Sequence, residues 1–333
     1  TQEGDGQTYG FDLTTGGNFA GGRGNLVFNV GYTKIGEVSQ ADRTFSRQAK
    51  DELLNPFGSF VAEQATTFYF PFPDDPFGGC IQFDPDSQLQ DCVDGYNFNP
   101  PNLFQLPQQR WTATALGRFE INDRAEFFTR ASFANTRTDT KIAPTGTFFA
   151  PFRLNVNNAF LGQAARDQLA AIDNNECEEP VFDDDDVLVG CDQLAATAGD
   201  GFIDVELGRR ITELGSRDSF FENTAYQFVG GLRGSFAETQ RWEVFAQYGR
   251  TSRNQRFAND TSLARVQQSL LAVDLGDGPV CLDPVDANCA PGNFFGPGNL
   301  DAAALDYIRL NIQQIDSLDQ LVAGGSLTGD LPF

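Results

Sequence analysis

Residues 111–133, WTATALGRFEINDRAEFFTRASF, decide the fold class because they contain two alternating segments around a short polar turn. Apolar or small residues occupy every second position from Trp111 to Phe119, and the residues between them are Thr112, Thr114, Leu116 and Arg118. After the turn at Asn122, the alternation resumes at Phe127 and continues to Phe133. Successive strand residues point to opposite faces of a sheet, so this stretch predicts a two-faced β-hairpin.

The same pattern on either side of this hairpin predicts an all-β, antiparallel fold. A first hairpin turns near Ala20 and a third near Thr239, and one more strand begins near the C-terminal end of the sequence. The predicted strands, about seven in all, lie near residues 7–15, 24–36, 109–120, 124–138, 203–236, 241–255 and 324–333.

Short and long connections alternate strictly along the chain. The stretches 37–108, 139–203 and 256–315 are many times longer than the roughly four to six residues typical of compact domains. Because hairpin strands are antiparallel, all short turns fall at one end of the sheet and all long loops at the other. This asymmetry is typical of outer-membrane barrels, so we expect periplasmic turns and extracellular loops.

Aromatic residues bracket the apolar faces, which separates a membrane barrel from a soluble sandwich that would also alternate. Trp111 and Phe119 lie eight residues apart, which spans roughly 20 Å of bilayer normal at a tilt of about 40°. Trp242 and Tyr248 bracket a later strand in the same way. The opposite face carries charges that suit a wet lumen. The pattern predicts an antiparallel transmembrane β-barrel segment occupying residues 1–333.

The net charge of the sequence restricts the possible binding partners. The formal net charge is −23, with 46 acidic against 23 basic residues, which argues against nucleic acid because phosphate backbones are bound by clustered cations. Cations or basic partners fit better, and the acidic loops disfavour a strongly anionic ligand unless calcium reverses the local field. Since the chain contains no Met, we expect it to be an internal part of a longer protein.

The six cysteines occur two to a long loop, which predicts three local disulfides and an oxidising compartment. The predicted pairs are Cys80 with Cys92, Cys177 with Cys191, and Cys281 with Cys289. Zinc is the alternative, but the chain has no His and no C-x-x-C spacing.

Signals for metals and catalysis are few. The run Asp183, Asp184, Asp185 and Asp186 is either a calcium site or a solvated acidic loop. No other cofactor is expected. Without His there is no Ser-His or Cys-His pair, and nothing singles out two carboxylates for glycoside hydrolysis, so we expect no enzymatic activity.

Aromatic residues also cluster within the long loops. Two interpretations are open: they form a binding vestibule for an apolar or sugar ligand, or they pack the loops onto each other. These residues are Phe68, Tyr69, Phe70, Phe148, Phe149, Phe294 and Phe295.

Scattered short segments over most of the chain resemble the barrel region of TonB-dependent outer-membrane receptors, particularly the long-loop kind of sphingomonad and Caulobacter-like bacteria. These segments are 22–34, 124–128, 209–217 and 295–308. The resemblance implies a barrel of about 22 strands with an N-terminal plug, importing siderophores, vitamins, saccharides or other scarce nutrients. The sequence contains no TonB box, no plug domain and fewer than half of those strands.

Three functional hypotheses follow. The first is part of a transporter that contacts outer-membrane lipid and lipopolysaccharide, binds a small nutrient ligand and couples to TonB through a plug. The second is a β-rich interaction fragment that assembles into a homo-oligomer through open strand edges. The third is a small passive pore, which requires an even number of strands.

Overall fold

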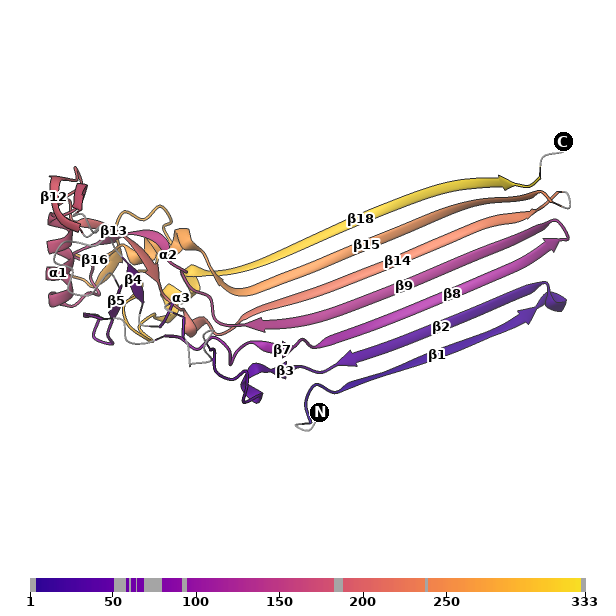
Figure 1. Cartoon of the computed structure of the whole chain (residues 1–333), viewed down its shortest axis with the longest axis horizontal. Coiled ribbons are helices and arrows are strands. Elements are labelled where there is room, and N and C mark those ends of the chain that lie inside the picture. Colours follow the sequence, from indigo (N-terminus) through magenta and orange to yellow (C-terminus); the bar gives the residue numbers. More distant parts are fainter. Residues whose placement is uncertain are drawn as a thin grey trace.

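The computed structural model describes residues 4–50, 58–59, 61–63, 65–68, 80–91, 95–182, 188–236 and 239–330. Seven long strands form one open, curved antiparallel sheet, and a compact body lies at one end of it (Figure 1). In spatial order the strands are β1 (Thr8–Phe19), β2 (Gly24–Ile35), β8 (Gln108–Asn122), β9 (Ala125–Ile142), β14 (Arg217–Ser235), β15 (Arg241–Thr261) and β18 (Arg309–Thr328).

The pairing register is continuous across the sheet. Trp111 on β8 lies opposite Tyr32 on β2 and opposite Asn135 on β9. The short turns, including the 3-10 turn η1 (Ala20–Gly22), lie at the end away from the compact body (Figure 1). At η1 the φ angles of Ala20 and Gly21 are 52° and 68°, and glycine tolerates this left-handed region without steric cost.

The sheet does not close on itself within the part of the chain that the structure describes. β1 and β18 are its two edges, and each pairs with one neighbour only. The fold is therefore an antiparallel β-sheet with two open edges.

We call the compact body the cap; it consists of the described residues of the three long connections, 36–107, 143–216 and 262–308. Its largest sheet draws on two connections, in the order β10 (Ala150–Asn155), β13 (Phe202–Gly208), β4 (Thr66–Phe68), β5 (Cys80–Phe83) and β6 (Leu89–Asp91). The cap also contains three two-stranded sheets. They pair β3 (Val38–Ser39) with β7 (Leu103–Gln105), β11 (Cys177–Phe182) with β12 (Leu188–Leu194), and β16 (Ala272–Asp274) with β17 (Pro279–Cys281).

Helices α1 (Gln163–Asn174), α2 (Leu263–Leu270) and α3 (Ala302–Ile308) pack around this sheet, with short 3-10 turns η2 (Gln40–Asp42) and η3 (Thr212–Leu214). On α1 the buried residues Ala165, Leu169 and Asp173 recur every four positions, so one helix face turns inward. The Asp301 carboxylate accepts from the Ala304 N–H at 2.8 Å and caps α3. Among the described residues, no helix combines the length and apolarity that crossing a membrane requires.

One hydrophobic core joins all three connections. Phe83 comes from the first, Leu169 and Ile203 from the second, and Phe294 and Ile308 from the third; all five are buried together. The long loops therefore form one folded body, not three separately stapled loops.

Two predicted strand boundaries are wrong. The stretch 203–236 is not one strand, because β13 pairs with β10 and β4 inside the cap. The chain leaves that sheet at Arg209 and enters the long sheet only at Arg217. The last strand spans Arg309–Thr328 and not 324–333, so the third connection is shorter than the predicted 256–315; residues 331–333 lie outside the described residues.

Candidate functional site

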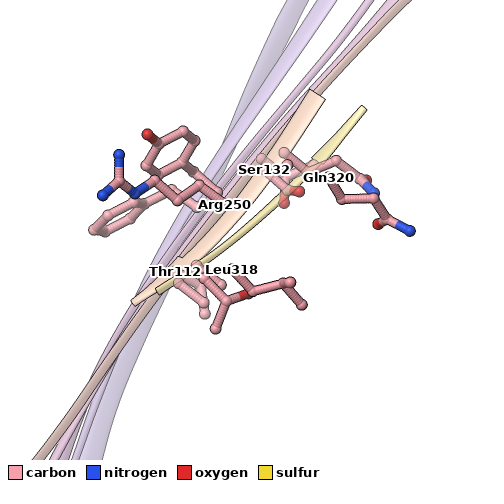
Figure 2. A pocket seen from close by; sticks show the side chains of 13 residues that line it. Thr112, Ser132, Arg250, Leu318 and Gln320 are labelled. Carbon is pink, nitrogen blue, oxygen red and sulfur yellow. The ribbon is translucent and has the colours of Figure 1, made fainter. Parts of the chain in front are cut away.

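The long sheet has one apolar and one polar face, because residues in register on neighbouring strands share a face. Figure 2 shows Arg250 and Gln320 projecting to opposite sides of the sheet. The apolar face holds large side chains without a covering layer: Phe228 is 54% exposed and Leu321 is 79% exposed. Its other large members include Phe11, Leu13, Phe28, Trp111, Phe133, Leu232 and Val244.

A line of aromatic residues crosses the apolar face near the cap, with one on each strand of the long sheet from β1 to β15. The rings of Tyr32 and Trp111 lie 4.5 Å apart, and those of Phe11 and Trp111 lie 6.0 Å apart. Tyr248, one of the predicted bracketing aromatics, belongs to the same line. The line consists of Tyr9 on β1, Tyr32 on β2, Trp111 on β8, Phe133 on β9, Tyr226 on β14 and Tyr248 on β15.

This aromatic line descends steadily across the strands. Tyr9 pairs with Lys34 on β2, and Lys34 pairs with Gln109 on β8, so Tyr9 and Gln109 lie in one row across the strands. Tyr248 lies on β15, five strand pairings from Tyr9 on β1. Followed through the pairs across β14 and β9, Tyr248 lies in one row with Ala115 on β8. The line thus drops by the six residues that separate Gln109 from Ala115.

A second group of aromatics lies near the turns on the same face. The rings of Phe19 and Phe119 stack at 6.0 Å with 10° between their planes. Phe119 lies opposite Phe127 on β9, and Trp242 occupies this end of β15. The predicted bracketing residues Trp111, Phe119, Trp242 and Tyr248 therefore share one face at its two ends.

The polar face carries an ionic network near the turns. The Arg233 guanidinium contacts the Glu126 carboxylate at 2.5 Å, and Arg118 approaches the same carboxylate at 3.8 Å. Further along, Arg130 donates to Gln227 Oε1 at 3.2 Å. Polar side chains from five strands, Thr114, Ser132, Gln227, Thr251 and Gln320 among them, line a hollow of about 440 Å³ (Figure 2).

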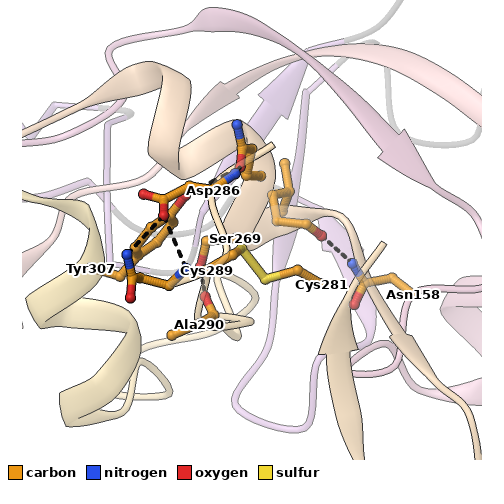
Figure 3. Close-up of a disulfide and its surroundings, with 10 residues drawn as sticks. Asn158, Ser269, Cys281, Asp286, Cys289, Ala290 and Tyr307 are labelled. Carbon is orange, nitrogen blue, oxygen red and sulfur yellow. Dashed lines mark hydrogen bonds between the residues drawn. A yellow bond between two sulfur atoms is a disulfide. The ribbon is translucent and has the colours of Figure 1, made fainter. Parts of the chain in front are cut away.

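Two of the predicted disulfides are present in the cap. Cys177 pairs with Cys191 across β11 and β12, and Cys281 pairs with Cys289. Beside the second bond, the Ser269 hydroxyl donates to Ala290 O at 2.7 Å (Figure 3). Cys80 lies in β5, but Cys92 lies outside the described residues, so that pair stays a prediction.

The predicted loop aromatics that the structure describes lie in different surroundings. Phe294 and Phe295 are completely buried, and the Phe295 ring lies 4.7 Å from that of Phe83, so these two pack the connections together. Phe148 is 47% exposed. Phe68 belongs to β4, whereas Tyr69 and Phe70 lie outside the described residues.

The acidic run Asp183, Asp184, Asp185 and Asp186 also lies outside the described residues, so the calcium prediction stays open. Within the described part of the chain, no three His, Cys, Asp or Glu residues form a group that could hold a metal ion.

An arginine cluster at the base of the cap is the feature that the sequence pattern did not reveal. Arg209 is completely buried, donates to Glu213 Oε1 at 2.6 Å and also donates to the carbonyl of Arg210. Burial lowers the pKa of Arg209, and Glu213 partly offsets this. The i,i+4 spacing of Arg209 and Glu213 is the only signal of this pair in the sequence.

Arg210 is held differently, by carbonyls and rings. Its guanidinium donates to Pro144 O at 2.9 Å and to Val61 O at 3.2 Å. It lies 5.1 Å from the Tyr96 ring centroid and 5.0 Å from that of Phe148. Burial lowers the pKa of Arg210, and repulsion from Arg217 adds to that effect.

Comparison with known proteins finds no matching family, no matching curated protein and no matching solved structure.

Proposed function

We propose that the long sheet is part of a transmembrane β-barrel in the bacterial outer membrane, and that the chain belongs to a nutrient transporter resembling TonB-dependent receptors. The observation that carries this proposal is the uncovered apolar face with aromatic residues at both ends. An exposed apolar surface of this extent requires a lipid or protein partner. Aromatic belts at both edges are the pattern of barrels in lipid.

The slope of the aromatic line supports lipid as the partner. A drop of six residues over five strand pairings corresponds to about 20 Å along the strands over about 24 Å across them. The strands then tilt by about 40° from the normal of a plane through the rings, within the usual range for outer-membrane barrels. A soluble sheet has no reason to keep its aromatics in one oblique plane.

The height of the apolar band agrees with this orientation. Trp111 and Phe119 are eight residues apart on β8, which is about 26 Å along the strand and roughly 20 Å along the tilted normal. The polar face then lines the lumen. The cap, with its disulfides, lies on the extracellular side and binds the nutrient before it enters the barrel.

The two tryptophans make a direct test possible, because Trp111 and Trp242 are the only tryptophans of the chain and lie at opposite ends of the apolar face. The full chain is reconstituted into phosphatidylcholine vesicles brominated either near the headgroup or near the chain end. We expect stronger fluorescence quenching by the shallow bromines for both residues. Trp111→Phe and Trp242→Phe separate the two signals. Equal emission in brominated and unbrominated vesicles would contradict the proposal.

The open edges favour one further candidate, self-assembly into a homo-oligomer. β18 presents Ile315, Leu318 and Leu321 with 66%, 70% and 79% exposure, and its edge away from β15 has no partner among the described residues. Such an edge is a template for pairing with another chain. Native mass spectrometry from detergent distinguishes the two: a ladder of multimers supports self-assembly, whereas a monomer with bromolipid quenching supports the barrel.

A further inference from the structure

We propose that Phe148, Arg210 and Arg217 form a recognition site for a small aromatic carboxylate on the cap. The inference rests on the proposed role of the cap in ligand binding and names the class of ligand. The proposed ligand has one carboxylate and one planar ring, and the protein that binds it has a strongly negative net charge.

The first observation is a concentration of positive charge without a counter-ion. Arg210 is 4% exposed, and Arg217 lies 5.4 Å from the same Phe148 ring that Arg210 contacts. In the described part of the chain, neither arginine forms an ion pair with a carboxylate. Glu213 pairs with Arg209, and Asp260 accepts from Thr145. Glu63 acts electrostatically on Arg209 and Tyr96 but forms no ion pair with Arg210 or Arg217.

The second observation is that Arg217 has N–H groups that no described residue engages. Its Nε donates to Ala143 O at 3.0 Å, which fixes the plane of the guanidinium. No acceptor among the described residues engages its two terminal nitrogens. A fixed guanidinium with free terminal N–H groups is suited to a carboxylate, which it binds through parallel hydrogen bonds.

The third observation is how Phe148 is presented. The Ala150 N–H donates to Thr147 O at 2.9 Å and closes a four-residue turn. Its central residues Phe148 and Phe149 have φ angles of 50° and 57°, a conformation normally left to Asn and Gly. This turn leaves Phe148 47% exposed while the guanidinium groups of Arg210 and Arg217 lie against its ring.

Together these features match a ligand with an aromatic ring and one negative charge. The ring packs on the exposed part of Phe148, and the carboxylate accepts hydrogen bonds from Arg217. The buried charge of Arg210 adds attraction without direct contact, so Arg210 is a positioning residue. Phosphate alone would use the charge but not the ring, and a neutral aromatic would use the ring but not the charge.

Isothermal titration of the full chain in detergent with benzoate tests the proposal, with benzamide, cyclohexanecarboxylate and inorganic phosphate as comparison probes. We expect saturable benzoate binding at least tenfold tighter than that of each comparison probe. Phe148→Leu and Arg217→Gln should each weaken benzoate binding at least tenfold, and Arg217→Lys should weaken it less than Arg217→Gln.

Phe104→Leu is the matched control, because Phe104 is 61% exposed on the cap and its ring lies against that of Phe45; it should leave binding unchanged. Benzoate binding that is no tighter than benzamide binding, or that survives Phe148→Leu, overturns the proposal. Intact bromolipid quenching with no benzoate binding overturns the ligand class alone, whereas lost quenching overturns the barrel.

Discussion

The Glu213 carboxylate accepts a 2.6 Å hydrogen bond from Arg209, whose side chain has no exposed surface. This pair lies where the chain leaves β13 for β14, so it links the cap to the long sheet. Arg209 also donates to the Arg210 carbonyl, which connects it to the neighbouring cation.

Glu213→Ala should destabilise the cap by about 3 to 5 kcal/mol, because it leaves a buried guanidinium without its counter-ion. Hydrogen–deuterium exchange of cap peptides measures the change in opening free energy. The control is Asp306→Ala, since the Asp306–Arg309 pair is 75% and 37% exposed; its loss should cost less than about 1 kcal/mol. Similar costs for the two variants would contradict the role of burial.

Tyr96 gives the cap a dependence on alkaline pH. Burial raises the pKa of its phenol, with an opposing effect of Arg210. The stability that this group contributes is fully present below its unfolded pKa of about 10 and is lost as the pH rises through the higher folded pKa. The difference in absorbance at 295 nm between the wild type and Tyr96→Phe isolates this titration. Tyr96→Phe should also flatten the alkaline loss of cap structure; a titration at the ordinary pKa would refute this.

The two faces of the sheet should differ in their tolerance of charge. Phe28 lies midway along β2 between Tyr32, which is opposite Trp111, and Gly24, which is opposite Phe119, and Phe28→Arg should cost about 2 to 4 kcal/mol in lipid. Thr114→Arg on the neighbouring strand β8 and opposite face should cost less than about 1 kcal/mol, because the polar face already carries arginines. Urea unfolding from vesicles, followed by tryptophan emission, measures both. Equal costs on the two faces would remove the reason for placing lipid on one of them.

The two observed disulfides should contribute to different units. Cys289 packs against the cap core, so replacing Cys281 and Cys289 by Ser should destabilise the whole cap by about 2 to 3 kcal/mol. The bond between Cys177 and Cys191 closes an exposed hairpin, so its loss should increase exchange in β11 and β12 only. Peptide-resolved hydrogen exchange of the two double variants distinguishes these patterns.

Period-two alternation predicted the strands that have one apolar face along most of their length. β8 and β9 are the clearest cases, because the positions of Trp111 and Phe119 keep one parity without interruption. β18 was recognised only at its end. Its apolar residues Ile312, Ile315, Leu318 and Leu321 recur every three positions, and a bulge in the pairing with β15 between Phe257 and Asp260 shifts the register. That spacing hides a strand from a search for alternation.

The cap could not be predicted, because its structure depends on contacts between distant segments. Phe83 and Phe295 touch across most of the chain, and no local pattern contains that contact. β13 alternates like a strand of the long sheet, with Ile203, Val205 and Leu207 buried, and only its partners β10 and β4 reveal that it belongs to another sheet. The arginine cluster depends on the same distant packing, since Arg210 reaches Val61 and Tyr96.

The shared core of the cap also limits how this protein can change during evolution. Phe83, Leu169 and Phe294 come from three different connections and lie in one core. An insertion or exchange within one connection therefore exposes side chains of the other two, and compensating substitutions must arise there. The three connections therefore evolve together, and replacing a single connection by one from another protein should fail where replacing all three together succeeds.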